Sequence, residues 1–183
     1  MSNELADLIS GYASHKNVVW NGVPTHEPFA AVLTCSDARV TPSLVFGREQ
    51  GDLFVVRNAG NSATAAALAS LDFAAEALGV PVVLVMGHTA CGAVEGALDP
   101  ESPPYLDPIL DPLRATMAVT GAKAPEDLSF AHARRTAGLL RTHPGPVGQR
   151  IREGVVQLVP MVFDLKSGIV RDAASDARPE ISV

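Results

Sequence analysis

Hydrophobic residues occur along this chain in short continuous runs, each closed by a polar or glycine-containing segment. The runs at 29–34, 53–56 and 82–86 have the length and β-branched content of strands that are buried on both faces of a sheet. A fourth run at 155–164 is followed by a turn sequence, Lys166-Ser167-Gly168, and by Ile169-Val170. This order predicts a strand, a turn and a return strand near the C-terminus.

Segments with helical features fill the intervals between these runs. The clearest helix spans 62–78, where the sequence is rich in alanine and Gly79 can cap the C-terminal end. Thr41 can serve as an N-cap, and Pro42 would then occupy the first helical position, where proline is favoured. The predicted helices outside 62–78 lie at 42–47, from Cys91-Gly92 onward, at 125–142 and at 147–153.

Two further segments differ from this alternation. Near the N-terminus, apolar side chains recur at helical spacing and predict a short amphipathic helix that needs another surface to pack against, such as a second subunit. These side chains are Leu5, Leu8, Ile9 and Tyr12. The stretch at 99–111 is dense in proline and aspartate and is interpreted as a surface excursion.

Strands that alternate with helices predict an α/β protein. We expect a mainly parallel central β-sheet flanked by helices, with an antiparallel edge hairpin near the C-terminus and an N-terminal helical arm. A length of 183 residues suits a single domain spanning 1–183. Within it we expect an arm at 1–27, a core that carries the functional site at 28–98, and C-terminal helices and edge strands at 99–183.

Composition and charge exclude several classes of partner. A formal net charge of −6 argues against nucleic acid or an anionic membrane, because both favour clustered lysine and arginine. No apolar run approaches the ~18 residues that a membrane-spanning helix needs. The first residues lack the basic and then apolar layout of a signal peptide. Two cysteines cannot form a disulfide framework, which favours a reducing compartment, the cytoplasm.

The candidate chemistry lies where the buried runs end. Cys35 follows the first run directly, and His88 and Cys91 follow the third. In parallel sheets ligands bind beyond the carboxyl ends of the strands, so these side chains are expected to meet there. Thiolate and imidazole are the donors that zinc prefers, and three protein ligands leave a fourth position open, as in catalytic zinc sites. Taken singly, a buried cysteine is more often inert core packing. A redox pair lacks the usual Cys-x-x-Cys spacing.

Two charged residues and a glycine complete the candidate site. Asp37 and Arg39 lie two positions apart, which alone describes a common surface ion pair of little energetic value. In a functional interpretation, Arg39 holds Asp37 near the metal as a hydrogen-bond acceptor for zinc-bound water, or Asp37 binds zinc itself and displaces that water. Gly92, directly after Cys91, would let the backbone approach the metal or a bound anion closely.

Three motifs in this order resemble the β-class carbonic anhydrases. The first is Cys35-Ser36-Asp37-Ala38-Arg39-Val40, the second Phe54-Val55-Val56-Arg57-Asn58-Ala59-Gly60, and the third Gly87-His88-Thr89-Ala90-Cys91-Gly92-Ala93. The resemblance is strong over 28–98 and returns weakly at 162–168, which is similar to the family's last hairpin. Three ordered motifs are far more specific than any single match.

The resemblance implies one Zn²⁺ per subunit, bound by Cys35, His88 and Cys91, with Asp37 and Arg39 as the catalytic dyad. It implies reversible hydration of carbon dioxide to bicarbonate and a proton by zinc-bound hydroxide. It further implies a homodimer or an assembly of dimers, with active sites near the subunit interface and the N-terminal helix lying across the partner subunit. Two alternatives stay open: hydrolysis of carbonyl sulfide or carbon disulfide at the same zinc, and a non-catalytic zinc-binding regulatory protein.

This chain departs from the family pattern at two places, and a third position bears on whether Asp37 binds the zinc. His26 stands where many members carry a glutamine that can donate a hydrogen bond to substrate, and imidazole can also titrate. Phe73 stands where tyrosine is frequent, and with Phe54 it is a candidate to line an apolar substrate pocket, although plain core packing explains both equally well. Val32 stands where members that close readily tend to carry tryptophan, so we expect Asp37 off the zinc near neutral or higher pH.

Overall fold

The computed structural model describes residues 2–14, 22–23 and 25–181. Its strands form one sheet in the order β2-β1-β3-β4-β5. Pairing is parallel between β2, β1, β3 and β4, and antiparallel between β4 and β5. The strands are β1 (Ala30–Cys35), β2 (Leu53–Asn58), β3 (Val82–His88), β4 (Gln157–Phe163) and β5 (Val170–Asp172). The predicted fold class is confirmed, including the antiparallel C-terminal edge.

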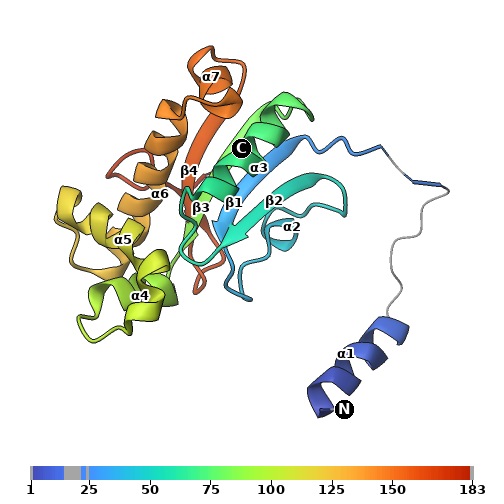
Figure 1. Cartoon of the computed structure of the whole chain (residues 1–183), viewed down its shortest axis with the longest axis horizontal. Helices are drawn as coiled ribbons and strands as arrows, with labels where there is room; N and C mark the ends of the chain where they lie inside the picture. The colour runs from blue at the N-terminus through green and yellow to red at the C-terminus, as the bar shows by residue number, and fades with distance from the viewer. Residues whose placement is uncertain (1, 15–21, 24, 182–183) are drawn as a thin grey trace.

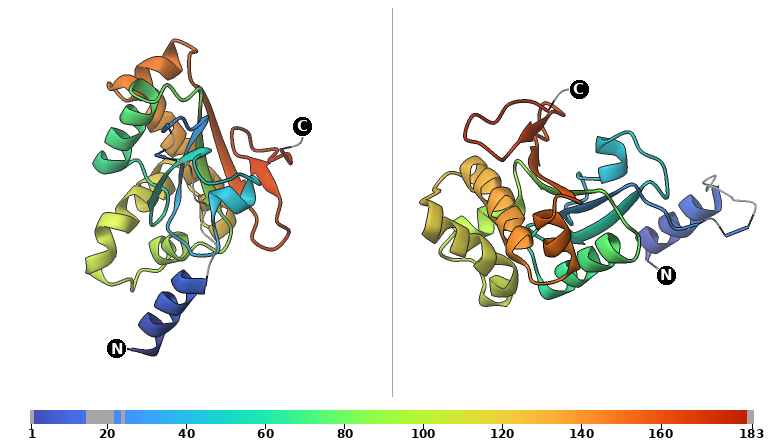
Figure 2. Two further views of the ribbon diagram at one scale, coloured as in Figure 1. Left: turned by 90° about the vertical axis from the view of Figure 1, so that its right-hand side faces the viewer. Right: turned by 90° about the horizontal axis from the view of Figure 1, so that it is seen from above.

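Helices cover the two faces of this sheet unequally. Figure 2 shows α3, α6 and α7 on one face of the sheet. The short α2 and the C-terminal segment, residues 173–181, lie on the other. The helices are α1 (Asn3–Ser14), α2 (Pro42–Val45), α3 (Ala65–Glu76), α4 (Gly92–Leu98), α5 (Asp107–Thr120), α6 (Pro125–Thr142) and α7 (Pro146–Arg152), with a 3-10 turn at Pro104–Leu106. Within the described residues, no helix combines the length and the apolar character needed to cross a membrane.

The core is divided among three clusters of buried side chains. The largest lies between the sheet and α3, α6 and α7, with Leu71, Phe130 and Leu140 among its members. A smaller one under α2 contains Val32 and Met86. The third is formed by α4 and α5 at the carboxyl ends of β1 and β3 and includes the two cysteines. The candidate site therefore has an apolar floor.

The N-terminal helix α1 lies apart from the sheet (Figure 1). Its apolar residues Leu5, Leu8, Ile9 and Tyr12 are all exposed. The helix has the predicted position in sequence, and the described residues of this subunit leave its apolar face exposed. Part of the expected arm, 15–21 and 24, lies outside the described residues, and the division at 27 and 98 stays a prediction.

The prediction that 53–56 forms a strand buried on both faces is wrong. The strand is present, but β2 is the edge of the sheet, and Val55 on it is exposed. A strand at the end of the order has a neighbour on one side only, and the apolar pattern of 53–56 does not encode that position.

The structure also corrects the interpretation of 99–111 as a surface excursion, because α5 begins at Asp107. Pro108 lies in its first turn, where proline is tolerated, and Gly121 ends it with a left-handed φ of 71°. Pro112 lies inside the helix, a position that usually breaks one and that hid α5 in the sequence. Burial of Leu110 and Leu113 compensates for this proline.

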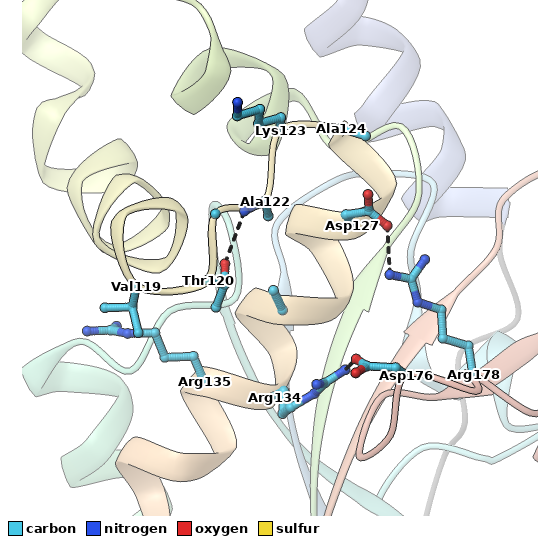
Figure 3. Close-up of a pocket in the computed structure, with 12 residues that line it drawn as sticks. Val119, Thr120, Ala122, Lys123, Ala124, Asp127, Arg134, Arg135, Asp176 and Arg178 are labelled. Atoms are coloured by element: carbon cyan, nitrogen blue, oxygen red, sulfur yellow. Dashed lines mark hydrogen bonds and ion pairs between the residues drawn. The ribbon is translucent and has the colours of Figure 1, made fainter.

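The C-terminal segment is fastened across α6 by ion pairs. A groove of about 760 Å³ lies between the loop after α5, α6 and this segment (Figure 3). On its wall Arg134 pairs with Asp176 at 2.8 Å and Arg178 pairs with Asp127 at 2.7 Å. The Arg178 guanidinium also lies 4.4 Å from the centre of the Phe130 ring. Arg134 and Arg178 thus link α6, which carries the buried His132, to the C-terminal segment.

Candidate metal centre

Three potential metal ligands meet where two neighbouring parallel strands end. Cys35 is the last residue of β1, and His88 is the last residue of β3. Cys91 is the N-cap residue of α4. One ligand atom from each residue lies within 4.8 Å of the others, and all three residues are buried. The two sulfurs are 3.9 Å apart.

A strained turn lets His88 and Cys91 face the same point. Ala90, between them, has a left-handed φ of 51°, which is rare for a residue with a side chain. The Ala90 carbonyl accepts a hydrogen bond of 3.0 Å from Arg39. The turn is therefore held from outside by the residue that also holds Asp37.

The imidazole of His88 is prepared to bind a metal. Its Nδ1 lies 2.9 Å from the Thr89 carbonyl, which can only accept, so this nitrogen carries the proton. Its Nε2 is buried and has no hydrogen-bond partner among the described residues. An unpaired buried acceptor is costly, and a metal ion would satisfy it. The donor set fits zinc, the metal of this kind of three-residue site.

The two thiols need a cation to be fully ionised together. Hydrogen bonding with Cys91 lowers the pKa of Cys35, and the amide of Gly60 acts in the same direction. The same hydrogen bond and burial raise the pKa of Cys91. The pair thus loses its first proton easily and its second only with difficulty. Thiolates are the metal-binding form, so a divalent cation would stabilise both.

Asp37 is held beside this cluster by Arg39. The guanidinium donates from Nε to Asp37 Oδ1 at 2.9 Å and from Nη2 to Oδ2 at 2.7 Å. Side-chain hydrogen bonds from Arg39 lower the pKa of Asp37 well below its usual range. Asp37 Oδ2 lies 3.9 Å from His88 Nε2. The carboxylate is thus ionised and adjacent to the ligand atoms, the arrangement expected when it is not itself a ligand.

Arg57 is a further residue of the candidate site, and sequence reasoning missed it. From the end of β2 it donates to three backbone carbonyls in the segment that carries Asp37: Cys35 at 3.0 Å, Asp37 at 2.7 Å and Val40 at 2.9 Å. It therefore fixes the path of the chain from the first cysteine through the dyad. The only signal in the sequence was its place inside the second family motif.

The predicted pocket residues lie apart from the cysteines of the same subunit. The centre of the Phe54 ring is 6.0 Å from that of His26 and 6.1 Å from that of Phe73. Phe54 is near the start of β2, whereas Asn58 at its end is paired with Cys35. Four residues of strand separate the two by about 13 Å. His26, Phe54 and Phe73, the aromatic cluster, thus lie together, away from their own subunit's Cys35.

Gly92 is the first residue of α4, next to Cys91. Apart from its chain neighbours and the backbone of its own helix, no heavy atom of the described residues lies within 4 Å of the position that a Cβ would occupy. Packing within the subunit therefore does not require glycine here, and the space beside the site is open.

The sequence and the fold of known proteins match this arrangement. The family described as carbonic anhydrase matches residues 30–170, which include every candidate ligand. The chain belongs to the β-carbonic anhydrases. Zinc is the metal of this enzyme family, and Cys35, His88 and Cys91 could hold it here.

Individual relatives extend this match over most of the chain. Carbonic anhydrase 2 of Mycobacterium tuberculosis is 28% identical over 85% of this chain and 80% of its own length. A tetrameric β-carbonic anhydrase of Sordaria macrospora has a TM-score of 0.73 at 23% identity and covers 92% of this chain and 93% of its own. A carbon disulfide hydrolase also shares the fold, with a TM-score of 0.58 at 21% identity, over 93% of this chain and 89% of its own.

Proposed function

We propose that this β-carbonic anhydrase catalyses the reversible hydration of carbon dioxide to bicarbonate and a proton, with one zinc ion per subunit. One observation carries the proposal: an ionised, arginine-held Asp37 lies 3.9 Å from the unpaired Nε2 of a buried Cys-His-Cys cluster. A structural zinc site needs no carboxylate at that place. The two cysteines are free thiols, which supports a reducing compartment such as the cytoplasm.

Each residue of the candidate site has a different role in this proposal. Zinc held by Cys35, His88 and Cys91 would lower the pKa of a water molecule in its open position toward neutrality. Asp37 would accept a hydrogen bond from the nucleophile and orient it toward carbon dioxide. Arg39 keeps both Asp37 oxygens in place and keeps the carboxylate ionised. An ionised carboxylate can only accept a hydrogen bond, so Asp37 would hold the nucleophile with its O–H group directed toward the carboxylate.

Removal of the metal tests this proposal directly. Treatment with a strong chelator should reduce carbon dioxide hydration, measured by stopped-flow with a pH indicator, to the uncatalysed rate. Stoichiometric zinc should then restore it, because without the metal the cluster has no group that generates hydroxide from water near neutral pH. Parallel assays of sulfide release from carbonyl sulfide and carbon disulfide distinguish the alternative substrates. Sulfide release without carbon dioxide hydration would contradict the assignment, as would full activity in a zinc-free protein.

A second copy of the chain would complete the substrate pocket. The aromatic cluster is about 13 Å along β2 from its own cysteine. Its member Phe54 belongs to β2, the edge strand, which can face another subunit. We therefore propose a homodimer or an assembly of dimers in which the aromatic cluster lines the partner's site. The exposed apolar face of α1 supports this proposal, because a partner would cover it.

Disrupting α1 should weaken the assembly. Each of its apolar side chains stabilises an interface by about 1.5–3 kcal/mol when fully buried, so Leu8→Asp should lower the apparent mass in light scattering at micromolar concentration. Asp7→Ala changes a neighbouring exposed position on the same helix and serves as the matched control. Equal masses for both variants and the parent protein would show that α1 does not contribute to assembly.

His26 offers a second test of the shared pocket. If it supplies the donor that glutamine supplies elsewhere in the family, His26→Gln should preserve or raise the rate of hydration. His26→Ala should lower it by about three- to tenfold, the value of one hydrogen bond. In a protein dissociated by Leu8→Asp, the difference between these variants should disappear. Equal rates for all three assembled proteins across neutral pH would make His26 a bystander.

A further inference from the structure

A fully buried histidine lies in α6 among three hydroxyl groups. His132 Nδ1 is 2.9 Å from Thr116 Oγ1, and Nε2 is 3.0 Å from Ser62 Oγ and 3.5 Å from Thr136 Oγ1. Thr116 comes from α5, and Ser62 lies 70 positions earlier in the chain, after β2. One imidazole therefore joins two helices to the segment that follows the edge strand.

This histidine is neutral and its hydrogen bonds have a direction. Burial lowers the pKa of His132 to about 4, and the charge of nearby Arg135 acts in the same direction. The Thr116 hydroxyl donates to the Pro112 carbonyl at 3.0 Å, so it accepts from Nδ1–H. Nε2 is then the acceptor. The Ser62 hydroxyl lies 3.0 Å from it and 3.4 Å from the Gly60 carbonyl, so its single proton can be donated to either.

The segment that His132 holds is a tight turn at 58–62. Two consecutive residues, Gly60 and Asn61, have left-handed φ values of 77° and 45°. The Asn58 side chain spans the turn, donating to the Ser62 carbonyl and accepting from the Ser62 amide, both at 2.8 Å. Conformations of this kind persist only where the surroundings fix them. Ser62 is fixed twice, through its backbone by Asn58 and through its hydroxyl by His132.

The turn contacts a candidate zinc ligand. The backbone amide of Gly60 donates to Cys35 Sγ at a distance of 3.4 Å. A Cβ at Gly60 would lie 3.1 Å from the Leu113 side chain, which is a tight contact. Glycine at this position avoids that contact while its backbone lies against the Cys35 sulfur. Hydrogen bonds to a thiolate withdraw charge from it and tune the metal that it binds.

We propose that His132 is a positioning residue for the zinc site, which acts through Ser62 to hold the Gly60 amide on the Cys35 sulfur. Two thiolates place more negative charge on zinc than imidazoles do, and this amide withdraws part of it. The inference rests on the proposed function, because it assigns Cys35 to zinc. A purely structural role would not require a histidine with three hydroxyl partners, because an apolar side chain could fill the same space.

Cobalt substitution measures this effect at the sulfur itself. The full-length protein is loaded with Co²⁺ in place of zinc, and the thiolate-to-cobalt charge-transfer bands are recorded beside turnover of the zinc form. His132→Leu should move the bands to longer wavelength, because a sulfur without the amide is easier to oxidise. It should lower kcat about tenfold with little change in KM, the scale of loss typical of outer-sphere partners. Ser62→Ala, a smaller change, should act in the same direction.

Two further variants separate positioning from stability. His132→Gln retains a group able to bond Ser62 and should restore the bands toward those of the parent. Leu140→Ala removes a buried α6 side chain remote from the turn, so it should lower Tm and leave the bands unchanged. Parental bands in both His132→Leu and Ser62→Ala would overturn the proposal. If the bands shift but the parent does not hydrate carbon dioxide, the positioning role holds and the proposed reaction fails.

Discussion

Cys91→Ser should remove stoichiometric zinc and lower the rate of carbon dioxide hydration by more than about 100-fold, beyond the loss expected for an outer-sphere partner. The physical reason is the number of donors. Among the described residues, Cys35, His88 and Cys91 offer three candidate ligand atoms within 4.8 Å of one another, and a hydroxyl is a poor substitute for a thiolate on zinc. Cys35→Ser and His88→Ala should behave in the same way. Metal analysis and stopped-flow rates on the same samples check this result.

Thr34→Val is the matched control for the ligand variants. Thr34 is buried beside Cys35 on β1 and donates a hydrogen bond of 2.9 Å to the Met86 carbonyl. Its loss should destabilise the fold by about 1 kcal/mol without removing a ligand, so zinc content should stay at one per subunit. A fully active Cys91→Ser protein with stoichiometric zinc would refute the ligand assignment.

The sequence predicted the architecture because hydrophobic runs and strand ends follow simple rules. Cys35 and His88 each close an apolar run, and parallel strands bring such ends to one edge of the sheet. The predictions that failed depend on long-range context. The exposure of Val55 follows from strand order, and α5 survives Pro112 because Leu110 and Leu113 are buried around it. Neither condition can be read within the segment itself.

The site shows the same division between local and distant information. Asp37 and Arg39 could be paired from the sequence because they lie two residues apart. The contacts of Arg57 with the Asp37 segment and of His132 with Ser62 join residues 20 and 70 positions apart. No spacing rule connects such residues. The separation of the aromatic cluster from Cys35 of its own subunit likewise depends on the register of β2 against β1, which no local pattern encodes.

Asp37→Asn should keep zinc and lose turnover by about 100-fold or more, the lower end of what a positioned acid–base group contributes. Asp37 is outside the three-donor cluster, so metal content should be unchanged. The amide keeps one oxygen acceptor but replaces the other with an NH₂ group, which cannot accept from the nucleophile or from Arg39. Arg39→Ala should lose activity as well, because it removes both side-chain hydrogen bonds that hold the carboxylate.

The pH dependence of these proteins follows from the same ion pair. Arg39 lowers the folded-state pKa of Asp37, so the pair contributes to stability above the ordinary carboxyl pKa of about 3.9, and this contribution is lost as pH falls below it. Asp37 therefore stays ionised near neutrality, and the activity profile there should not report its titration.

Arg48→Ala is the control, because this arginine lies 5.0 Å over the Phe29 ring and does not hold the carboxylate. Unchanged kcat in zinc-loaded Asp37→Asn would reduce the dyad to a local ion pair.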